Sequence, residues 1–208
     1  MNSFFKNIKN IPDFPTVSNL SFHHIIELPK DIHVHNFNSK ENFESIQNLF
    51  SIGKYNEKRP FMYKGELFEK TERNIHMGLD IGAPIGTAIR SFYDGEIYLF
   101  KYNGHKLDYG YTLITKHFLN NQIIYALFGH LSKSSIENKK IGQKIKSGEV
   151  IGYVGKENEN GGWPPHVHFQ LCLLEPKKCD LPGVVSKKYH EIALRIFPDP
   201  RKILGQIY

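Results

Sequence analysis

Four histidines and one aspartate stand in short motifs whose residue types suit metal-dependent hydrolysis. They are His76 and Asp80 in HMGLD, His130 in FGHLS, and His166 and His168 in HVHF. Alternate residues of a β-strand share a face, so His166 and His168 point the same way if their segment is a strand. His76 and Asp80 have the same parity, and their side chains could also converge.

This set of side chains is large enough for a catalytic zinc site. Zinc in such sites takes three nitrogen or oxygen ligands from the protein and keeps one position open for water. Four imidazoles and one carboxylate can supply three ligands and leave two groups to transfer protons. Each motif alone is a weak signal, because a single histidine or aspartate beside glycine is more often a turn former or a hydrogen-bonded polar group.

The bulk composition indicates a folded protein of ordinary size. The chain has 208 residues, of which 40% are hydrophobic and 13% aromatic, which suits one domain with a buried core and argues against disorder throughout. The 27 basic and 21 acidic residues give a net charge of +6. The lysines are scattered and no recognition motif accompanies them, so we expect no nucleic-acid partner. A basic surface would equally suit an anionic polymer of the cell wall.

The cysteines and the apolar segments limit the chemistry and the compartment. Cys172 and Cys179 could form a disulfide, but neither belongs to a C-x-x-C pair, which argues against cysteine-based zinc or redox chemistry. The start, MNSFFKNIKNIPDFP, lacks the apolar core of a signal peptide, and no stretch is long enough to span a bilayer. The sequence as given therefore predicts a cytoplasmic protein, or a cell-envelope or secreted one if an export signal was removed.

Short strands separated by glycine-containing turns dominate the chain from residue 75 onward. Their alternation and their β-branched and aromatic content predict strands over residues 87–92, 95–102, 111–117, 122–127, 149–154 and 166–173. Residues 134–138 could form a short helical turn, and little else in this part has helical periodicity. We therefore predict an all-β fold, an antiparallel β-sandwich or barrel-sandwich hybrid.

Residues 1–70 differ from the rest and are predicted to form an irregular N-terminal extension packed on a β domain of residues 71–208. Several prolines and weak periodicity mark this part, with one possible helix over 39–52. His33 and His35 repeat the H-x-H spacing, but no carboxylate-bearing motif lies near them. We interpret them as exposed or hydrogen-bonded side chains.

The segment IGQKIKSGEVIGYVG predicts a strand that folds back over the sheet through a tight Lys-Ser-Gly turn. It is similar to the hammerhead segment of biotinyl and lipoyl carrier domains. The chain has no hairpin that would present a modifiable lysine, and a carrier would leave the histidines without a purpose. The segment therefore describes architecture rather than a carrier function.

The ordered motifs together resemble the lysostaphin-type zinc metallopeptidases. HMGLD followed by IGAPIGTAI, then GHLS, GQKIKSGEVIG and PHVHF, match in order across roughly residues 74–172, about half of the chain. The resemblance implies the fold of that family, a duplicated hybrid motif of β-strands. It also implies a zinc-dependent endopeptidase that hydrolyses short peptide links, such as those of peptidoglycan cross-bridges.

Carried over residue by residue, the resemblance implies that His76, Asp80 and His168 bind Zn²⁺ and that His130 and His166 are catalytic. Two neutral imidazoles and one carboxylate leave a zinc ion with positive charge to polarise a carbonyl and acidify a water. The remaining histidines could then accept the proton of the water and stabilise the developing oxyanion. The sequence does not distinguish which of the two does which.

Some residues depart from the family pattern. Residues 157–165, ENENGGWPP, stand where many members have a stretch rich in Ser, Thr and Gly, and Trp163 could form an apolar wall of the cleft. The sequence of residues 157–165, together with YNEKRP at residues 55–60, resembles a subgroup of the family found fused to kinase-like and aminotransferase domains. Tyr63 is the nearest candidate for a tyrosine that often assists the family's reaction, but its spacing differs.

Two other functions remain open at this point. The chain could be a metal-binding regulatory module without activity, although inactive relatives usually lack one or more of the five residues. It could also be an intracellular amide hydrolase, which would fit the missing export signal and the unusual Trp-Pro-Pro segment. The first 70 residues could cover the cleft as a latency segment, and the oligomeric state is not determined by the sequence.

Overall fold

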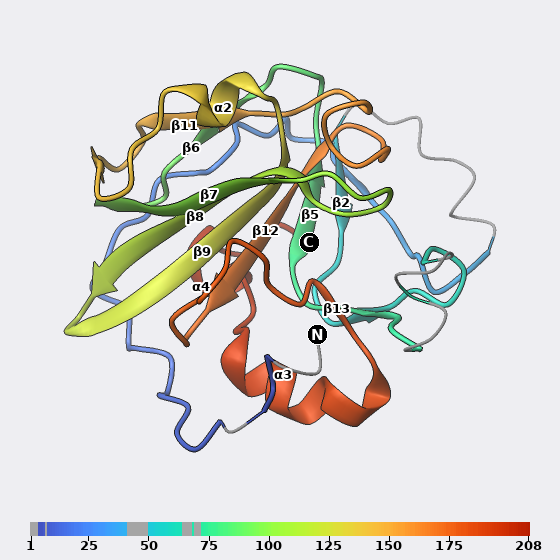
Figure 1. The fold of residues 1–208 in the computed structure, drawn as a ribbon, viewed down its shortest axis with the longest axis horizontal. Coiled ribbons are helices and arrows are strands. Elements are labelled where there is room, and N and C mark those ends of the chain that lie inside the picture. Colours follow the sequence, from blue (N-terminus) through green and yellow to red (C-terminus); the bar gives the residue numbers. More distant parts are fainter. Residues whose placement is uncertain (1–3, 7, 41–49, 64–67, 69–71) are drawn as a thin grey trace.

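One large, mostly antiparallel sheet forms the centre of the computed structural model, which describes residues 4–6, 8–40, 50–63, 68 and 72–208 (Figure 1). Its strands, in spatial order, are β1 (His33–Val34), β2 (Ser51–Gly53), β5 (Leu79–Gly82), β12 (His166–Cys172), β9 (Gln122–Leu131), β8 (Gly110–Leu119), β7 (Gly95–Asn103) and β10 (Lys144–Ile145). Only the pair β1–β2 within this described sheet is parallel.

Two smaller sheets and four short helices complete the described fold. The smaller sheets are β13–β4–β3 (Val184–Val185, Ile75–His76 and Glu57–Lys58) and β11–β6 (Val150–Tyr153 and Ala88–Arg90). The helices are α2 (Ser134–Glu137), the 3-10 helix η1 (Lys187–Tyr189), α3 (His190–Ile196) and α4 (Arg201–Leu204). In Figure 1, α2 lies beside β11 above the large sheet, and α3 lies below it.

The prediction of an antiparallel β fold is confirmed, and each of the six predicted strands overlaps an observed one. The short helical turn is confirmed as α2. The segment 141–155 contributes β10 to the large sheet and β11 to a small one, so it does fold over the sheet as predicted. Helix α3 was not predicted; the rings of Phe4 and Phe5 pack against Phe197 and Tyr189 at its two ends. Tertiary packing therefore stabilises a helix too short to be seen in the sequence.

Strand β12 separates the core from a polar cleft. Val167, Phe169 and Leu171 are fully buried in the main hydrophobic cluster. The alternate residues His166, His168 and Gln170 point to the opposite face. The apolar side chains therefore anchor the strand that carries the polar ones, and burying each of them contributes roughly 1.5–3 kcal/mol.

Residues before 70 take part in the described sheets. Strand β2 pairs with β5, and β3 pairs with β4. The helix predicted over 39–52 is wrong at its end, because Ser51 and Ile52 belong to β2, and residues 41–49 lie outside the described part. Pairing with β5 favours the extended conformation there over any local helical preference. The division near residue 70 into an extension and a β domain stays a prediction.

Two further findings concern the cysteines and the membrane. Cys172 and Cys179 are both buried and free, so they form no disulfide. Among the described residues, none of the helices combines the length and the apolar character needed to cross a bilayer.

Candidate metal centre and active-site cleft

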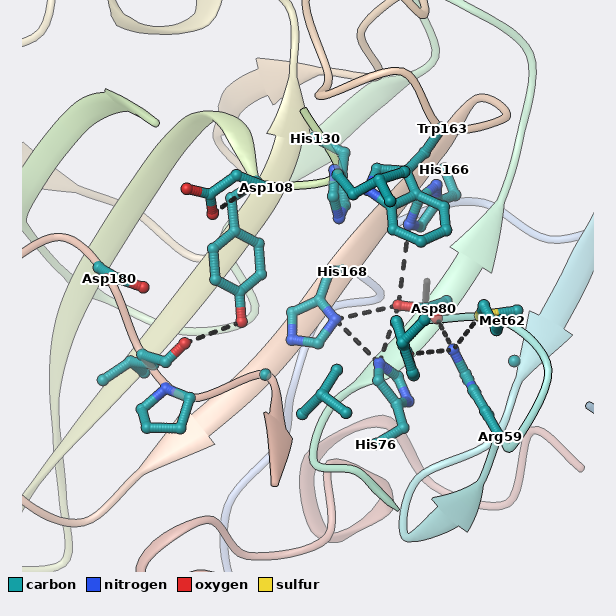
Figure 2. Close-up of a pocket in the computed structure, with 18 of the residues that line it drawn as sticks. Arg59, Met62, His76, Asp80, Asp108, His130, Trp163, His166, His168 and Asp180 are labelled. Carbon is teal, nitrogen blue, oxygen red and sulfur yellow. Dashed lines mark hydrogen bonds and ion pairs between the residues drawn. The ribbon is translucent and has the colours of Figure 1, made fainter. Parts of the chain in front are cut away.

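Three donor atoms from distant parts of the chain meet at one point. His76 Nε2 lies 3.0 Å from His168 Nδ1 and 3.2 Å from Asp80 Oδ1, and His168 Nδ1 lies 3.0 Å from the same oxygen. Figure 2 shows the two imidazoles and the carboxylate facing one another. His76 and His168 are almost fully buried, and Asp80 is partly buried.

Strand register and a change of sheet bring these residues together. His168 is directly opposite Asp80 in the pairing of β12 with β5. His76 ends β4 in a different sheet, and Met77 and Gly78 carry the chain into β5. The expected convergence of His76 and Asp80 is confirmed, but it arises from this passage between sheets rather than from one extended strand.

Gly78 is necessary for the close approach of this turn to His168. A Cβ atom at Gly78 would overlap the Cε1 and Nε2 atoms of the His168 ring and would lie 3.0 Å from the carbonyl oxygen of Phe169. Since the Phe169 backbone is fixed in β12, the imidazole of His168 is the group that has to move.

Gly78→Ala is therefore expected to weaken zinc binding by at least about 10-fold, the lower end of the effect of disturbing the surroundings of a metal ligand. Competition with a chromogenic chelator measures the affinity. Gly86→Ala is a suitable control, because a methyl group there would meet no atom within 4 Å, although its φ of +80° makes some loss of stability expected. Unchanged zinc affinity in Gly78→Ala would contradict the steric argument.

The hydrogen bonds on the outer side of the His76 and His168 rings determine which ring nitrogen carries the proton. His76 Nδ1 donates to the carbonyl of Lys54 at 3.0 Å, and His168 Nε2 donates to Gln170 Oε1 at 2.9 Å. In the neutral rings the inward nitrogens are therefore both lone-pair acceptors, and they face the carboxylate of Asp80. Three acceptors at this spacing repel one another unless a cation lies between them.

The donor set fits zinc in type and in spacing. Two imidazole nitrogens and one carboxylate oxygen are typical ligands of catalytic zinc. Bonds of that kind arranged tetrahedrally place the ligand atoms ~3.3 Å apart, close to the 3.0–3.2 Å observed here. The outward hydrogen bonds are the ones that orient metal-bound histidines and set their tautomer. These three residues could hold the ion with little movement.

The charge states of the ligands are also those that a metal requires. Burial, reinforced by the neighbouring Arg59, lowers the pKa of His76 to about 4, so that its ring is neutral at pH 7. Burial would raise the pKa of Asp80, but the neighbouring His76 and Arg59 side chains hold it well below its usual value. A metal ion therefore has no proton to displace from either residue at neutral pH.

His130 and His166 form a second pair of imidazoles beside the three donors. Their ring centroids are 4.2 Å apart, and His166 Nε2 lies 3.9 Å from Asp80 Oδ1. His130 Nδ1 donates to the carbonyl of Asn160, and His166 Nδ1 donates to the carbonyl of Pro164, both at 2.7 Å. The Nε2 atom of each neutral ring is thus left as an acceptor. Burial lowers the pKa of both side chains, which keeps them neutral and able to accept a proton.

A β-bulge directs His130 into this site. The register of β8 with β9 passes from Tyr111↔Leu131 to Leu113↔Phe128, so β9 contains one extra residue at Gly129–His130. His130 has a φ of +62°, which is uncommon for any residue other than glycine. Bulges and backbone strain of this kind often occur next to active sites, where they redirect a side chain.

Asn160 holds the segment that precedes β12. It is fully buried; its Nδ2 donates to the carbonyl of Trp163 at 2.9 Å, and its Oδ1 accepts from the backbone N–H groups of Gly162 and Trp163. The carbonyl of the same residue accepts the bond from His130. Asn160 therefore couples the Trp-Pro-Pro segment to the orientation of His130, a role that the sequence did not reveal.

The five predicted residues all line one cleft of about 1420 Å³. Trp163 lies over His130 and His166 in Figure 2, with its ring centroid 6.4 Å from that of His130, so the predicted apolar wall is present. Asp108 and Asp180 lie toward the other end of the cleft, on the far side of His168. The opening extends well beyond the three candidate ligands on both sides.

Tyr63, Tyr109 and Gln170 add to the surroundings of the site. The Tyr63 hydroxyl accepts a hydrogen bond from Arg59 at 3.2 Å, and its ring lies 6.1 Å from that of Trp163. The Tyr109 ring lies 5.2 Å from that of His168. Neither Tyr109 nor Gln170 was predicted; Gln170 could have been, because it shares the parity of His166 and His168.

The other histidines do not join this cluster. His105 is exposed, His117 is buried and bonded to Thr115, and His190 begins α3. His33 is exposed as well. The prediction for His35 is wrong, because it is 2% exposed and neither ring nitrogen has a hydrogen-bond partner among the described residues.

Comparisons with known proteins give similarities that cover about half of the chain. The sequence profile of peptidase family M23 matches residues 74–178, just over half of the chain. The DD-carboxypeptidase/endopeptidase Mpg of Neisseria meningitidis serogroup B is 34% identical over 114 residues, which are 55% of this chain and 24% of that protein. The glycyl-glycine endopeptidase ALE-1 of Staphylococcus capitis is 28% identical over 95 residues, 46% of this chain and 24% of that protein.

Among solved structures, that of the antimicrobial peptidase lysostaphin from Staphylococcus simulans is 24% identical with a TM-score of 0.48, covering 76% of this chain and 50% of that one. This chain spans about a quarter of the length of the two relatives named above.

Proposed function

The chain belongs to peptidase family M23, and on that basis we propose that it is a zinc-dependent metalloendopeptidase that hydrolyses peptide bonds in peptidoglycan cross-bridges or similar short peptides. The observation that carries the proposal is the convergence of three inward-facing acceptors, His76, Asp80 and His168, beside two neutral imidazoles in one open cleft. A module that only bound metal would need the three ligands but not the second pair.

The protein's own residues can move the protons that amide hydrolysis requires. When bound by His76, Asp80 and His168, zinc would act as a Lewis acid and lower the pKa of a water molecule toward neutrality. His130 and His166 have their Nδ1 atoms fixed by backbone carbonyls, so the Nε2 atom of one can take a proton from the attacking water. While it carries that proton, the same ring can donate to the developing oxyanion, and it can then pass the proton to the departing amine.

The cleft suits an extended peptide. Its volume of about 1420 Å³ exceeds that of a typical small-molecule pocket, and it extends past the candidate metal ligands in both directions. The relatives are named as a DD-carboxypeptidase/endopeptidase and a glycyl-glycine endopeptidase, which supports a short peptide as the substrate, and the net charge of +6 would attract an anionic wall polymer. Such a substrate would place the activity in the cell envelope. The predicted resemblance to a subgroup fused to kinase-like and aminotransferase domains stays a prediction.

A cleavage assay with parallel metal analysis tests the proposal. Purified protein loaded with zinc should bind about one ion per chain and should release new amino termini from cross-linked muropeptides. Treatment with a chelator should stop the reaction, and added zinc should restore it. Full zinc occupancy without cleavage on a panel of muropeptides and short Gly- and Ala-containing peptides would instead favour a metal-binding regulatory module. Cleavage of small-molecule amides alone would favour a different amide hydrolase.

A further inference from the structure

Arg59 is a fully buried cation that lies directly behind the candidate metal centre. It is 1% exposed, and its Nη1 donates to Asp80 Oδ2 at 2.6 Å, as Figure 2 shows. The opposite oxygen of the same carboxylate, Oδ1, faces His76 and His168. Arg59 precedes residues 74–178, so it lies outside the part of the chain that the family profile matches.

The guanidinium group of Arg59 is held on three sides. Besides the bond to Asp80, Nε donates to Glu57 Oε2 at 3.0 Å and Nη2 donates to the carbonyl of Lys54 at 3.3 Å. Glu57 is itself fixed, since its Oε1 accepts a hydrogen bond from the backbone of Phe37 at 3.0 Å. A guanidinium fits such a set because its planar fork directs several donors at fixed angles, which an ammonium group cannot do.

The same short segment also orients a second ligand. The carbonyl of Lys54, which Arg59 contacts, accepts the hydrogen bond from His76 Nδ1 at 3.0 Å. The backbone of β2 also lies against Asp80. A Cβ atom at Gly53 would be 3.2 Å from Asp80 Cβ and 2.8 Å from Arg59 Nη2. Residues 53–59 thus contact two of the three candidate ligands.

We propose that the segment 53–59 is an integral part of the metal centre, in which Arg59 is a positioning residue that binds Asp80 Oδ2 and leaves Oδ1 alone to the metal ion. The inference rests on the proposed metal site but not on which bond the protein hydrolyses. Without Arg59, the Asp80 carboxylate could rotate, or both of its oxygens could bind the metal ion. With Arg59 in place, the three inward atoms keep the spacing that zinc requires.

This arrangement changes the interpretation of the N-terminal part of the chain. A removable latency segment could be cut away with a gain of activity. A chain that starts near Phe61 would instead lose β2, β3, the carbonyl of Lys54 and the guanidinium of Arg59, and Asp80 would keep a buried charge without its partner.

Zinc affinity of Arg59 variants tests the proposal. In the full-length chain, Arg59→Lys keeps the charge but cannot reach Glu57, Asp80 and the Lys54 carbonyl together, and Arg59→Gln removes the charge as well. We expect Arg59→Lys to bind zinc about 10–100-fold more weakly than the unmodified chain, and Arg59→Gln at least as weakly. The visible spectrum of the cobalt-loaded protein should also change, because it reports the geometry of the ligands.

Arg201→Gln is the matched control. Arg201 also pairs with an aspartate, Asp199, at 2.7 Å, but on α4 and outside the cleft, so its loss should leave zinc affinity and the cobalt spectrum unchanged. Should Arg59→Gln fail to fold, the Glu57→Gln variant tests the proposal instead. That change removes only the charge that accepts the hydrogen bond from Arg59 Nε. We expect several-fold weaker zinc binding in that variant.

The possible outcomes separate positioning from a merely structural role and from the proposed function. A structural role would lower the melting temperature of the metal-free and zinc-loaded forms equally, with zinc affinity within twofold of the unmodified chain and an unchanged cobalt spectrum; that result would overturn the proposal. A protein that binds zinc in the expected order of affinities but cleaves no peptide would refute the proposed function and leave the role of Arg59 standing.

Discussion

Replacing His168 with alanine is expected to abolish zinc binding at micromolar protein concentration and, with it, all hydrolysis. The change removes one of the two imidazole nitrogens in the proposed set of three ligands and breaks the contacts with Asp80 and His76, each at 3.0 Å. The loss of affinity should exceed the roughly 10–100-fold that follows from removing an outer hydrogen-bond partner of a ligand. Elemental analysis after dialysis against a weak chelator measures the remaining metal.

His105→Ala serves as the control for this variant, because His105 is exposed and does not line the cleft. It should keep full zinc content and activity. The metal-free forms of both variants should give the far-UV spectrum of a folded β protein, because the face of β12 opposite His168 is anchored in the hydrophobic core. Full zinc retention by His168→Ala would contradict the assignment of the ligands.

His130→Ala is expected to lower kcat by roughly 10²–10⁴-fold, the usual contribution of a general acid or base, while the zinc content stays unchanged. His130 contacts none of the three donor atoms, and its ring centroid is 6.3 Å from that of His168. Removing its ring therefore removes a proton acceptor without removing a ligand. Steady-state cleavage of a fluorogenic peptide together with elemental analysis checks both halves of the expectation.

His105→Ala is also the control for the second experiment, because His105 is exposed and does not line the cleft. It should be as active as the unmodified chain. Should His130→Ala lose its zinc along with its activity, His130 would act through the metal centre and not as a proton-transferring group. Wild-type activity in His130→Ala would leave His166 as the only catalytic imidazole among those proposed.

Much of the fold followed from local patterns. The alternation of apolar and polar residues along 166–173 predicted both the strand and the shared face of His166 and His168, because the two-residue period is a property of the extended backbone. Predictions were weakest where neighbours decide the conformation. Ser51 and Ile52 pair with β5 as a strand although their local pattern predicted a helix. Helix α3 depends on packing against aromatic side chains from the start of the chain.

The candidate ligands illustrate the same division. The ordered motifs identified five residues through their resemblance to a family. The structure places all five in one cleft and brings the donor atoms of His76, Asp80 and His168 together within it. Arg59 belonged to a stretch that the sequence analysis noted without giving it a role. An arginine carries no local signal that distinguishes a surface side chain from one buried against a carboxylate 21 positions away.

The sequence by itself determined which donor types the chain offers and on which face of each strand they lie, since residue chemistry and backbone alternation are local properties. Only the tertiary structure decided that β4 and β5 belong to different sheets and still deliver His76 and Asp80 to one ion-sized space. It also decided that a bulge directs His130 toward them and that Arg59 takes one carboxylate oxygen and leaves the other. These outcomes depend on strand register and on hydrogen bonds between residues far apart in the chain, and no local pattern encodes those.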